Sequence, residues 1–439
     1  MSLAASDPGE SFPAQMDSVA DREALYRFLA NPKVTLAGVL SGHVRQTHGW
    51  MRGRAVVRIV HDTSTFRFVG DREGRIRGGA KGFLGHLALA IAADETREPL
   101  GVLGVHPYIH RDAVAHHGMT LRQRVEATRA KPRAAKESAR WEQMALTVSA
   151  ALPAGVRALH VMDQEANDYD VLAALHAAQL HYVIRASPTR QTTAAKRCVK
   201  DVLAQQPTTV FRTVPLTPRS ERKAIVTRGR HPGRTERDAM LHMRWGTIMI
   251  GRRQYTESTT PTLSVSAVHV FEPEPPPGAA PIEWMLFTSE AVQSVADATD
   301  IVDHYRARWV IEEYFKALKT GCAFEKRQLT TLDGLVRALA FFIPMAWRLL
   351  VLRHLGRADR PLPVRHVLDT EQLCLLRKLL DRRRYQLPPR PPVRDAMLSI
   401  AALGGHITNN GAPGWLVLGR GLSRFLEAEL GWQLARAEM

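Results

Sequence analysis

The chain has 439 residues, of which 45% are hydrophobic, so it can form two or three domains with buried cores. Its 60 Lys and Arg outnumber 43 Asp and Glu, and this formal charge of +17 makes nucleic acid the expected partner. The longest apolar run without a charge, residues 338–347, is too short to cross a bilayer, and the N-terminus does not resemble a signal peptide. No membrane partner is therefore expected. Three scattered cysteines argue against a disulfide framework and favour a reducing cytoplasm: Cys198, Cys322 and Cys374.

The first part of the chain predicts a mixed sheet with helices packed on it. A short helix over residues 22–30 ends at Asn31-Pro32. Strands and helices then follow, with strands over 55–60, 87–92, 100–105, 156–162 and 181–185 and helices over 136–150 and 169–178. Asp62 stands just past the first of these strands, and Asp163 comes directly after the fourth. Ligand and catalytic groups collect at the carboxyl ends of strands in open sheets, so both aspartates are candidate site residues.

The second part of the chain predicts a change of architecture. Residues 189–281 are predicted to form a β-rich insertion, with a cationic stretch from Arg219 to Arg237 and a Pro-rich linker over 272–281. Strand character within the insertion occurs over 208–214, 247–250 and 263–270. Long helices follow. The predicted plan is an N-terminal helical region over 1–50, a core over 51–188 and 282–355 that the insertion interrupts, and a C-terminal helical dimerisation region over 356–439.

The segment from Tyr305 to Lys319 is predicted to form one helix with two distinct faces. Four polar residues share about a 60° arc of one face: Tyr305, Arg308, Glu312 and Lys319. The opposite side predicts a buried apolar stripe of Val310, Ile311, Tyr314, Phe315 and Leu318. The polar face offers a carboxylate to a metal ion, and cations and a phenol to phosphate. The plainer interpretation is a solvated face with an Arg308–Glu312 ion pair, worth only a few tenths of a kcal/mol.

Three carboxylates could form one metal site if the strands before the two aspartates are neighbours. Asp62, Asp163 and Glu312 would then hold two Mg²⁺ ions about 4 Å apart and clamp the attacking and leaving oxygens of a phosphodiester. Hard oxygen ligands on a basic protein favour magnesium and nucleic acid over zinc. A single aspartate after a strand is often only a turn former or a helix cap. The prediction therefore depends on the three residues together.

These motifs resemble those of the DDE transposases of bacterial insertion sequences, in the insertion-sequence-four branch that includes the transposon-five transposase. That branch has a Tyr-x2-Arg-x3-Glu-x6-Lys signature, and four residues reproduce its spacing: Tyr305, Arg308, Glu312 and Lys319. The segment His61-Asp62-Thr63-Ser64 is similar to the surroundings of the family's first aspartate. Residues 162–168 are similar to the surroundings of the second, with Gln164 in place of the usual Arg. The resemblance covers roughly residues 12–439.

The resemblance implies an α/β fold with a ribonuclease-H-like mixed-sheet catalytic core, a β-rich insertion, and helical N- and C-terminal regions. It implies an endonuclease and strand-transfer enzyme in which Asp62, Asp163 and Glu312 bind two Mg²⁺ ions, with Mn²⁺ able to substitute. Water would nick the transposon end, and the freed 3′-hydroxyl would form a hairpin that water then opens. The 3′-hydroxyl would finally attack target DNA. The implied partners are double-stranded DNA, as terminal inverted repeats and as target, and a second copy in a homodimer in the bacterial cytoplasm, bound at the nucleoid.

Further residues acquire roles only through this resemblance. Four would hold backbone phosphates near the cut without reading the base sequence: Tyr305, Arg308, Lys319 and Arg185. Trp284 matches a family tryptophan that stacks on a flipped base, and Trp309 would add a second aromatic wall. Judged without the family, Trp284 is more simply a core residue at the start of a strand.

The N-terminal region departs from the family pattern. Residues 11–15 already resemble the stretch that follows the family's end-binding helix, so we expect a truncated end-recognition element. Two hypotheses follow. The chain is an active cut-and-paste transposase, or it is a non-enzymatic DNA-binding protein that inhibits full-length subunits by pairing with them. A simple ribonuclease-H-like nuclease is less favoured, because it would not need Trp284 and Tyr305.

Overall fold

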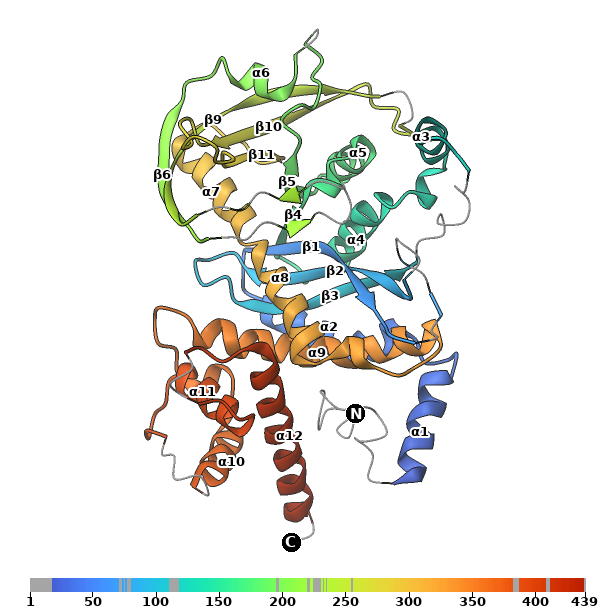
Figure 1. Ribbon diagram of the computed structural model, residues 1–439, viewed down its shortest axis with the longest axis vertical. Helices are drawn as coiled ribbons and strands as arrows, with labels where there is room; N and C mark the ends of the chain where they lie inside the picture. The colour runs from blue at the N-terminus through green and yellow to red at the C-terminus, as the bar shows by residue number, and fades with distance from the viewer. Residues whose placement is uncertain are drawn as a thin grey trace. The chain divides into compact units, whose positions relative to one another are not determined.

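The computed structural model (Figure 1) describes residues 18–70, 73–74, 76, 80–109, 118–194, 197–218, 222–223, 230–231, 233, 235–253, 256–381, 387–407 and 411–437. Residues 11–15 and part of the cationic stretch, on which two of the predictions above rest, lie outside these ranges. The chain forms two compact units. Unit 1 consists of Met1–Arg124, Ala151–Arg157 and Trp309–Met439, and unit 2 consists of Val125–Ala150 and Ala158–Arg308. Each unit therefore combines segments that are far apart in the sequence.

The sheet of unit 1 is an antiparallel meander in the order β3-β2-β1, with β1 (Val56–Arg67), β2 (Gly82–Ala92) and β3 (Pro99–Tyr108). The three strands predicted over 55–60, 87–92 and 100–105 are confirmed, but β1 is longer than predicted. Asp62 lies inside β1, opposite Leu87, so the prediction that it stands past the end of the strand was wrong. β-Branched and aromatic residues extend the strand beyond this aspartate: Thr63, Thr65 and Phe66.

The helices of unit 1 are α1 (Val19–Ala30), α2 (Leu36–Met51), α8 (Trp309–Lys316), α9 (Leu332–Gly356), α10 (Thr370–Asp381), α11 (Val393–Leu403) and α12 (Trp415–Ala437). Short 3₁₀ turns lie at η7 (Phe324–Lys326) and η8 (Val364–His366). α1 confirms the first predicted helix, with Ser18 as its N-cap and Asn31 at its end. α2 was not predicted. It packs against β3, where a Cβ on Gly101 would meet the Thr47 hydroxyl at 2.0 Å, so this contact requires glycine.

Helix α9 lies in the core of unit 1. It extends at both ends beyond the charge-free run of residues 338–347, and it therefore includes Arg337 and Arg348. With a mean hydropathy of 1.8, it is the one helix in the described ranges that is long and apolar enough to cross a membrane. Since 61% of that segment is buried inside the fold, as in the core helix of a soluble protein, this is weak evidence for a membrane span.

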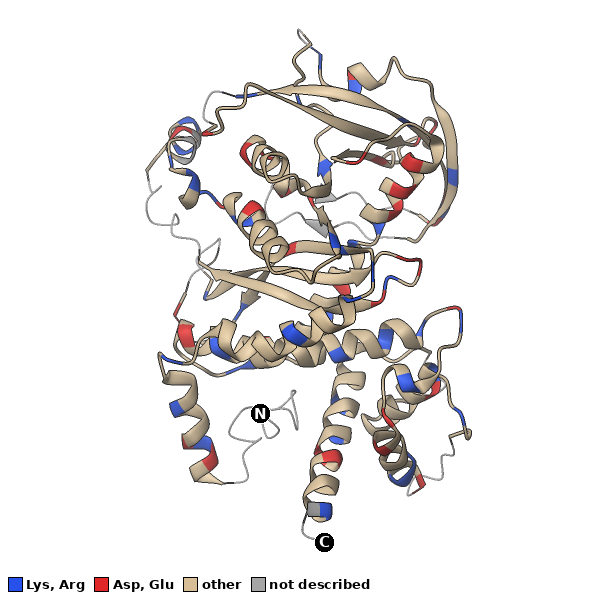
Figure 2. Cartoon of the chain, turned by 180° about the vertical axis from the view of Figure 1, so that it is seen from behind, with Lys and Arg blue, Asp and Glu red and all other residues tan. Residues whose placement is uncertain are grey.

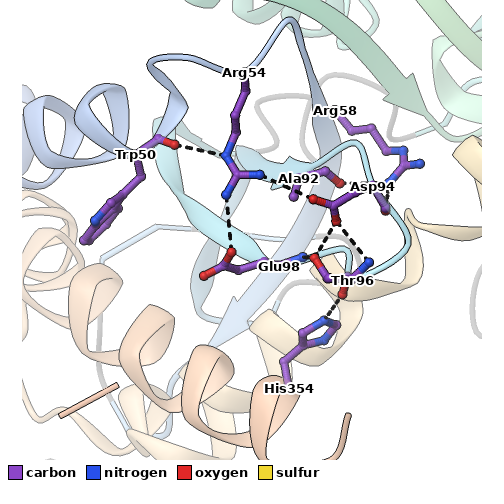
Figure 3. Close-up of polar contacts among 8 residues, drawn as sticks. All are labelled: Trp50, Arg54, Arg58, Ala92, Asp94, Thr96, Glu98 and His354. Atoms are coloured by element: carbon purple, nitrogen blue, oxygen red, sulfur yellow. Dashed lines mark hydrogen bonds and ion pairs between the residues drawn. The ribbon is translucent and has the colours of Figure 1, made fainter. Parts of the chain in front are cut away.

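The turn between β2 and β3 is tied down by charged side chains (Figure 3). Arg54 pairs with Asp94 and with Glu98, in each case at 3.4 Å. The Thr96 side chain donates to Asp94, and the main-chain oxygen of Thr96 lies 2.7 Å from Nε2 of His354 in α9. These contacts hold one end of the meander against the longest helix of unit 1. The strand that carries Asp62 therefore belongs to a well-anchored sheet.

The sheet of unit 2 has six strands in the order β4-β5-β11-β10-β9-β6. They are β4 (Arg157–Met162), β5 (His181–Ala186), β6 (Thr209–Leu216), β9 (Arg237–Gly251), β10 (Thr262–Phe271) and β11 (Glu283–Thr288). β4 and β5 are parallel and the other pairs are antiparallel, so this sheet is mixed, as predicted. The strands of the predicted insertion continue this sheet through β11. A separate short pair consists of β7 (Arg222–Lys223) and β8 (Arg230–His231).

Four helices surround the sheet of unit 2. α4 (Ala139–Ala150), α5 (Tyr169–Ala177) and α6 (Val199–Leu203) share one hydrophobic cluster with residues of β5, β9, β10 and β11. α7 (Val295–Arg306) packs against β5, β9, β10 and β11. Before α4 come α3 (Leu121–Arg129), which contains the limit between the units, and the turn η4 (Arg133–Ala135). The Pro-rich residues 272–281 connect the paired strands β10 and β11 and are not a domain edge.

The prediction of a single helix from Tyr305 to Lys319 was wrong, because two helices share this segment. α7 ends at Arg306, because the N–H of Arg308 bonds to the Tyr305 oxygen at 3.0 Å in a tight turn. α8 starts at Trp309 and passes into a π-helical turn, η6 (Ala317–Gly321), which contains Lys319. The division between the units falls within this signature, so Tyr305 and Arg308 belong to unit 2. The predicted stripe is nevertheless confirmed as buried: Val310, Ile311, Tyr314, Phe315 and Leu318.

Candidate functional site

Two of the three predicted carboxylates lie near one lysine in unit 1. Asp62 is in β1, and Glu312 is in the first turn of α8, which packs against β1. A carboxylate in the first turn is favoured by the helix dipole. Lys319, in η6, donates from Nζ to the main-chain oxygen of Thr65 at 2.6 Å, and this Nζ lies 4.0 Å from the Glu325 carboxylate. The lysine is therefore bonded to the strand that carries Asp62.

The electrostatics of Lys319 connect the two carboxylates. Burial lowers the pKa of Lys319 and Arg67 lowers it further, while three carboxylates act in the opposite direction: Glu325, Glu312 and Asp62. Burial dominates, so the net shift of the pKa is downwards. Asp62 and Glu312 are thus both close enough to act on a single ammonium group, although they come from a strand and a helix far apart in the sequence.

Asp163 is the corresponding carboxylate of unit 2. It follows β4 directly, as predicted, and is the N-cap of the turn η5 (Gln164–Ala166). Its Oδ1 accepts a hydrogen bond from the N–H of Glu165 at 2.8 Å. The structure thus gives Asp163 a capping role, which the sequence left open beside a metal-binding one. Arg185 lies in the neighbouring parallel strand β5, one residue beyond Ile184, which pairs with Met162.

Tyr305 brings Asp163 together with two predicted cations. Its side chain is buried, and burial raises the pKa of its hydroxyl, an effect that Arg308 and Arg185 oppose and Asp163 reinforces. The hydroxyl also shares a side-chain hydrogen bond with Arg185. Unit 2 therefore contains one cluster of a carboxylate, a phenol and two guanidinium groups at the end of α7. The phenol and the two guanidinium groups were predicted to bind phosphate, and the carboxylate was predicted to bind a metal ion.

The two predicted tryptophans differ in their surroundings. Trp284, the second residue of β11, packs edge-on against Tyr305, with ring centroids 5.4 Å apart and planes at 73°. It is only partly buried, and thus it borders the unit 2 cluster. Trp309 is the first residue of α8 and is 62% exposed, with Nζ of Lys316 at 5.8 Å from its ring centroid. An exposed indole at a helix start offers a flat apolar surface to a ligand.

Carboxylate oxygens are the ligands that Mg²⁺ prefers, so the donor chemistry of Asp62, Glu312 and Asp163 fits a divalent ion. The first two lie in unit 1 and the third in unit 2. Among the residues that the structure describes, no group of three or more His, Cys, Asp or Glu side chains is placed to hold a metal ion.

Two arginines that the sequence interpretation missed hold the loop after β4. Arg190 donates from Nη1 to the main-chain oxygen and to Oδ1 of Asn167, at 2.8 and 2.5 Å. Arg133 binds Glu142 at 2.7 Å and lies 3.5 Å from Asp168. Arg190 comes five positions after Arg185 and two after Pro188, but nothing in the sequence indicated that its side chain is buried.

Basic residues occur throughout the described chain and not on one element alone. Figure 2 shows Lys and Arg on helices, strands and loops, interspersed with fewer acidic residues. The chain as a whole carries 60 Lys and Arg against 43 Asp and Glu. A distributed positive charge of this kind favours contact with a polyanion over several surfaces.

Comparison with known proteins gives a family match over more than half of the chain. Residues 113–343 match the family described as "Transposase DDE domain". The matched range contains Asp163 and Glu312 and begins after Asp62. Among solved structures, one match is described as "Cryo-EM structure of piggyBac transposase synaptic complex with hairpin DNA (SNHP)", at 11% sequence identity and a TM-score of 0.34. The alignment covers 78% of this chain and 55% of that chain, so it spans about half of that protein's length.

Proposed function

The chain belongs to the transposase DDE domain family, and from this premise we propose that it is a cut-and-paste DNA transposase of the insertion-sequence-four branch. Its reactions would be strand cleavage, hairpin formation and strand transfer at the ends of an insertion sequence. The observation that carries the proposal is the proximity of Asp62 and Glu312 to Lys319 in unit 1. This proximity brings two members of the predicted carboxylate triad together from distant segments of the sequence.

Asp62, Asp163 and Glu312 are the residues proposed to hold two Mg²⁺ ions, for which Mn²⁺ could substitute. When bound, the ions would stabilise charge on the attacking and leaving oxygens of the phosphodiester. Lys319 supports this role in unit 1, since its ammonium group offsets the repulsion between Asp62 and Glu312. In unit 2 the Asp163 carboxylate, Arg185 and Arg308 all act on the Tyr305 hydroxyl, so the proposed ligand and two proposed phosphate-binding cations lie around one phenol.

The chain's own cations would position the DNA. Arg185, Arg308 and Lys319 would bind backbone phosphates, and the Tyr305 hydroxyl would donate to a phosphate oxygen. The raised pKa of Tyr305 keeps this hydroxyl protonated at neutral pH, as a donor must be. Trp284 would stack on a base displaced from the duplex, and Trp309 would add a second aromatic surface.

The proposal includes a ribonuclease-H-like core. It is supported by the antiparallel meander β1–β3 in unit 1 and by the parallel pair β4–β5 in unit 2. The proposed partners are double-stranded DNA, as inverted repeats and as target, and a second copy of the chain in a homodimer. The proposed site of action is the bacterial cytoplasm.

Cleavage of a supercoiled plasmid that carries the DNA flanking the reading frame tests this function. We expect cleavage that requires Mg²⁺ and is lost on addition of EDTA. The variants Asp62→Asn, Asp163→Asn and Glu312→Gln should each lose more than about 100-fold in cleavage rate, which exceeds the effect of removing an outer-shell partner of a metal ligand. Each variant should still bind DNA, because the phosphate-binding cations remain.

Asp333→Asn is the matched control, because its side chain is 78% exposed at the start of α9. It should cleave at the native rate. Persistent cleavage by Asp163→Asn would exclude the proposed carboxylate set. A native chain that binds the DNA and inhibits a full-length relative, but never cleaves, would instead support the non-enzymatic alternative.

A further inference from the structure

Arg190 is a buried cation that the proposed chemistry does not use. It is 7% exposed, and its Nη1 donates to both oxygens of Asn167, the main-chain oxygen at 2.8 Å and Oδ1 at 2.5 Å. Its guanidinium carbon lies 6.0 Å from the ring centroid of Phe287 in β11. The side chain is therefore held between the core of unit 2 and one residue of the loop that follows β4.

Asp163 and Asn167 flank the short turn η5 (Gln164–Ala166) that follows β4. The Asp163 carboxylate accepts from the N–H of Glu165 at 2.8 Å, and the N–H of Asn167 bonds to the Gln164 oxygen at 3.1 Å. The next N–H, of Asp168, bonds to the Ala166 oxygen at 2.8 Å. These bonds make one compact turn, so a restraint on Asn167 also restrains the Asp163 side chain.

The backbone of Arg190 is itself fixed in unit 2. Its N–H bonds to the Ser187 oxygen at 3.1 Å, directly after β5, and its own oxygen accepts from Val199 at the start of α6 at 2.8 Å. Val199 and Phe287 are both fully buried in the hydrophobic cluster of unit 2. The guanidinium group therefore fixes the loop that contains Asn167 to the sheet of unit 2.

The cost of burying this charge argues against a merely stabilising role. Burial lowers the pKa of Arg190 to about 10, and the nearby Arg253 lowers it further, which measures how unfavourable the site is for a cation. Its hydrogen-bond acceptors are the two oxygens of Asn167, and the Asp168 carboxylate only partly opposes the downward shift of the pKa. Hydrogen bonds from a charged donor are directional, so these two bonds fix the geometry of Asn167.

We propose that Arg190 is a positioning residue, which through Asn167 holds the loop 163–168 so that the Asp163 carboxylate keeps the orientation needed for metal binding. This inference rests on the proposed function, in which Asp163 is a metal ligand. Outer-shell contacts of this kind orient the ligands of metal sites and tune their affinity.

The test compares Arg190→Met, Arg190→Lys and Asn167→Ala with the matched control Arg197→Met, an exposed arginine of the same unit. The first measurement is Mn²⁺ affinity of the protein alone, by electron paramagnetic resonance. The second is the single-turnover cleavage rate of the plasmid over a series of Mg²⁺ concentrations. The third is affinity for the same DNA without metal. Thermal unfolding shows which variants are folded.

We expect Arg190→Met to weaken Mn²⁺ binding by about 10- to 100-fold and to need correspondingly more Mg²⁺ for cleavage. Its DNA affinity should stay within about twofold of native, because Arg190 is buried. Arg190→Lys, which keeps a donor, should bind Mn²⁺ more tightly than Arg190→Met. The Mn²⁺ affinity of Asn167→Ala should lie between that of Arg190→Lys and that of the native protein. Arg197→Met should leave metal affinity unchanged.

Native Mn²⁺ affinity and a native Mg²⁺ profile in folded Arg190→Met would overturn the positioning role. If Arg190→Met does not fold, the same native behaviour in Arg190→Lys and Asn167→Ala together would overturn it. Asp163→Asn separates the two proposals. If it still cleaves DNA, the catalytic assignment itself fails, whereas if it is inactive while the Arg190 variants behave as native, only the positioning role fails.

Discussion

Nζ of Lys319 lies 2.6 Å from the main-chain oxygen of Thr65, three positions beyond Asp62 in the same strand. The lysine therefore fixes η6 to β1 and at the same time places a positive charge near Asp62 and Glu312. One side chain links the strand and the helix that supply two of the proposed metal ligands.

Replacing Lys319 separates its structural and electrostatic contributions. Lys319→Met removes the hydrogen bond to Thr65 and the charge, so we expect a loss of about 1–3 kcal/mol in the free energy of unfolding, as for other hydrogen bonds to charged groups. The cleavage rate should fall as well. Urea unfolding and plasmid cleavage measure the two effects. Lys316→Met is the control, since Lys316 is half exposed and forms a surface ion pair with Glu313; it should change stability by less than about 0.5 kcal/mol.

Trp284 should matter more for hairpin formation than for the first nick. If it stacks on a displaced base, Trp284→Ala should lose about 1–3 kcal/mol of stacking, which is about 5- to 150-fold in the rate of hairpin formation. Nicking precedes base displacement and should change less. Trp284→Phe keeps the edge-on contact with Tyr305 in part and should be intermediate. Gel analysis of both products over time decides the question, and an equal loss of both steps would instead indicate disruption of the Tyr305 cluster.

The stability of unit 1 should depend on pH through His43. This histidine is 7% exposed in α2, its Nε2 accepts from the N–H of Val102 at 3.0 Å, and burial lowers its pKa from 6.5 to about 4. Because the unfolded chain binds the proton more readily, stability is fully present above pH 6.5 and falls as the pH drops towards 4, by about 3 kcal/mol at 1.4 kcal/mol per pKa unit.

The variant His43→Gln should reduce this pH dependence, because glutamine has no proton to gain in this range. Urea unfolding between pH 4 and pH 7 measures the slope of the unfolding free energy against pH for both proteins. His160, which is fully buried and has its pKa lowered to about 3, contributes a similar slope and is unchanged in the variant. An identical slope in the two proteins would contradict the assignment to His43.

Much of the fold could be predicted from local patterns. The strand before Asp163 and the strand that contains Arg185 lie where they were predicted, and the stripe from Val310 to Leu318 is buried as its spacing requires. The end of the first helix was equally informative, since α1 ends at Asn31 as the sequence indicated, although it starts earlier than predicted, after the N-cap Ser18. The boundary of β1 was not predictable, because whether Asp62 ends a strand or continues it depends on the pairing with β2.

The sequence predicted the family but not the arrangement of the candidate site. The residue types and spacing of Asp62, Asp163, Glu312 and the Tyr305–Lys319 segment predicted a DDE transposase, and the family match over residues 113–343 confirms the family. Only the tertiary structure decided that this segment is two helices, with Tyr305 and Arg308 in unit 2 and Glu312 and Lys319 in unit 1. Helical periodicity did not reveal the tight turn that ends α7. The burial of Arg190 depends on contacts with residues far from it in the chain, such as Asn167 and Phe287, which no local pattern encodes.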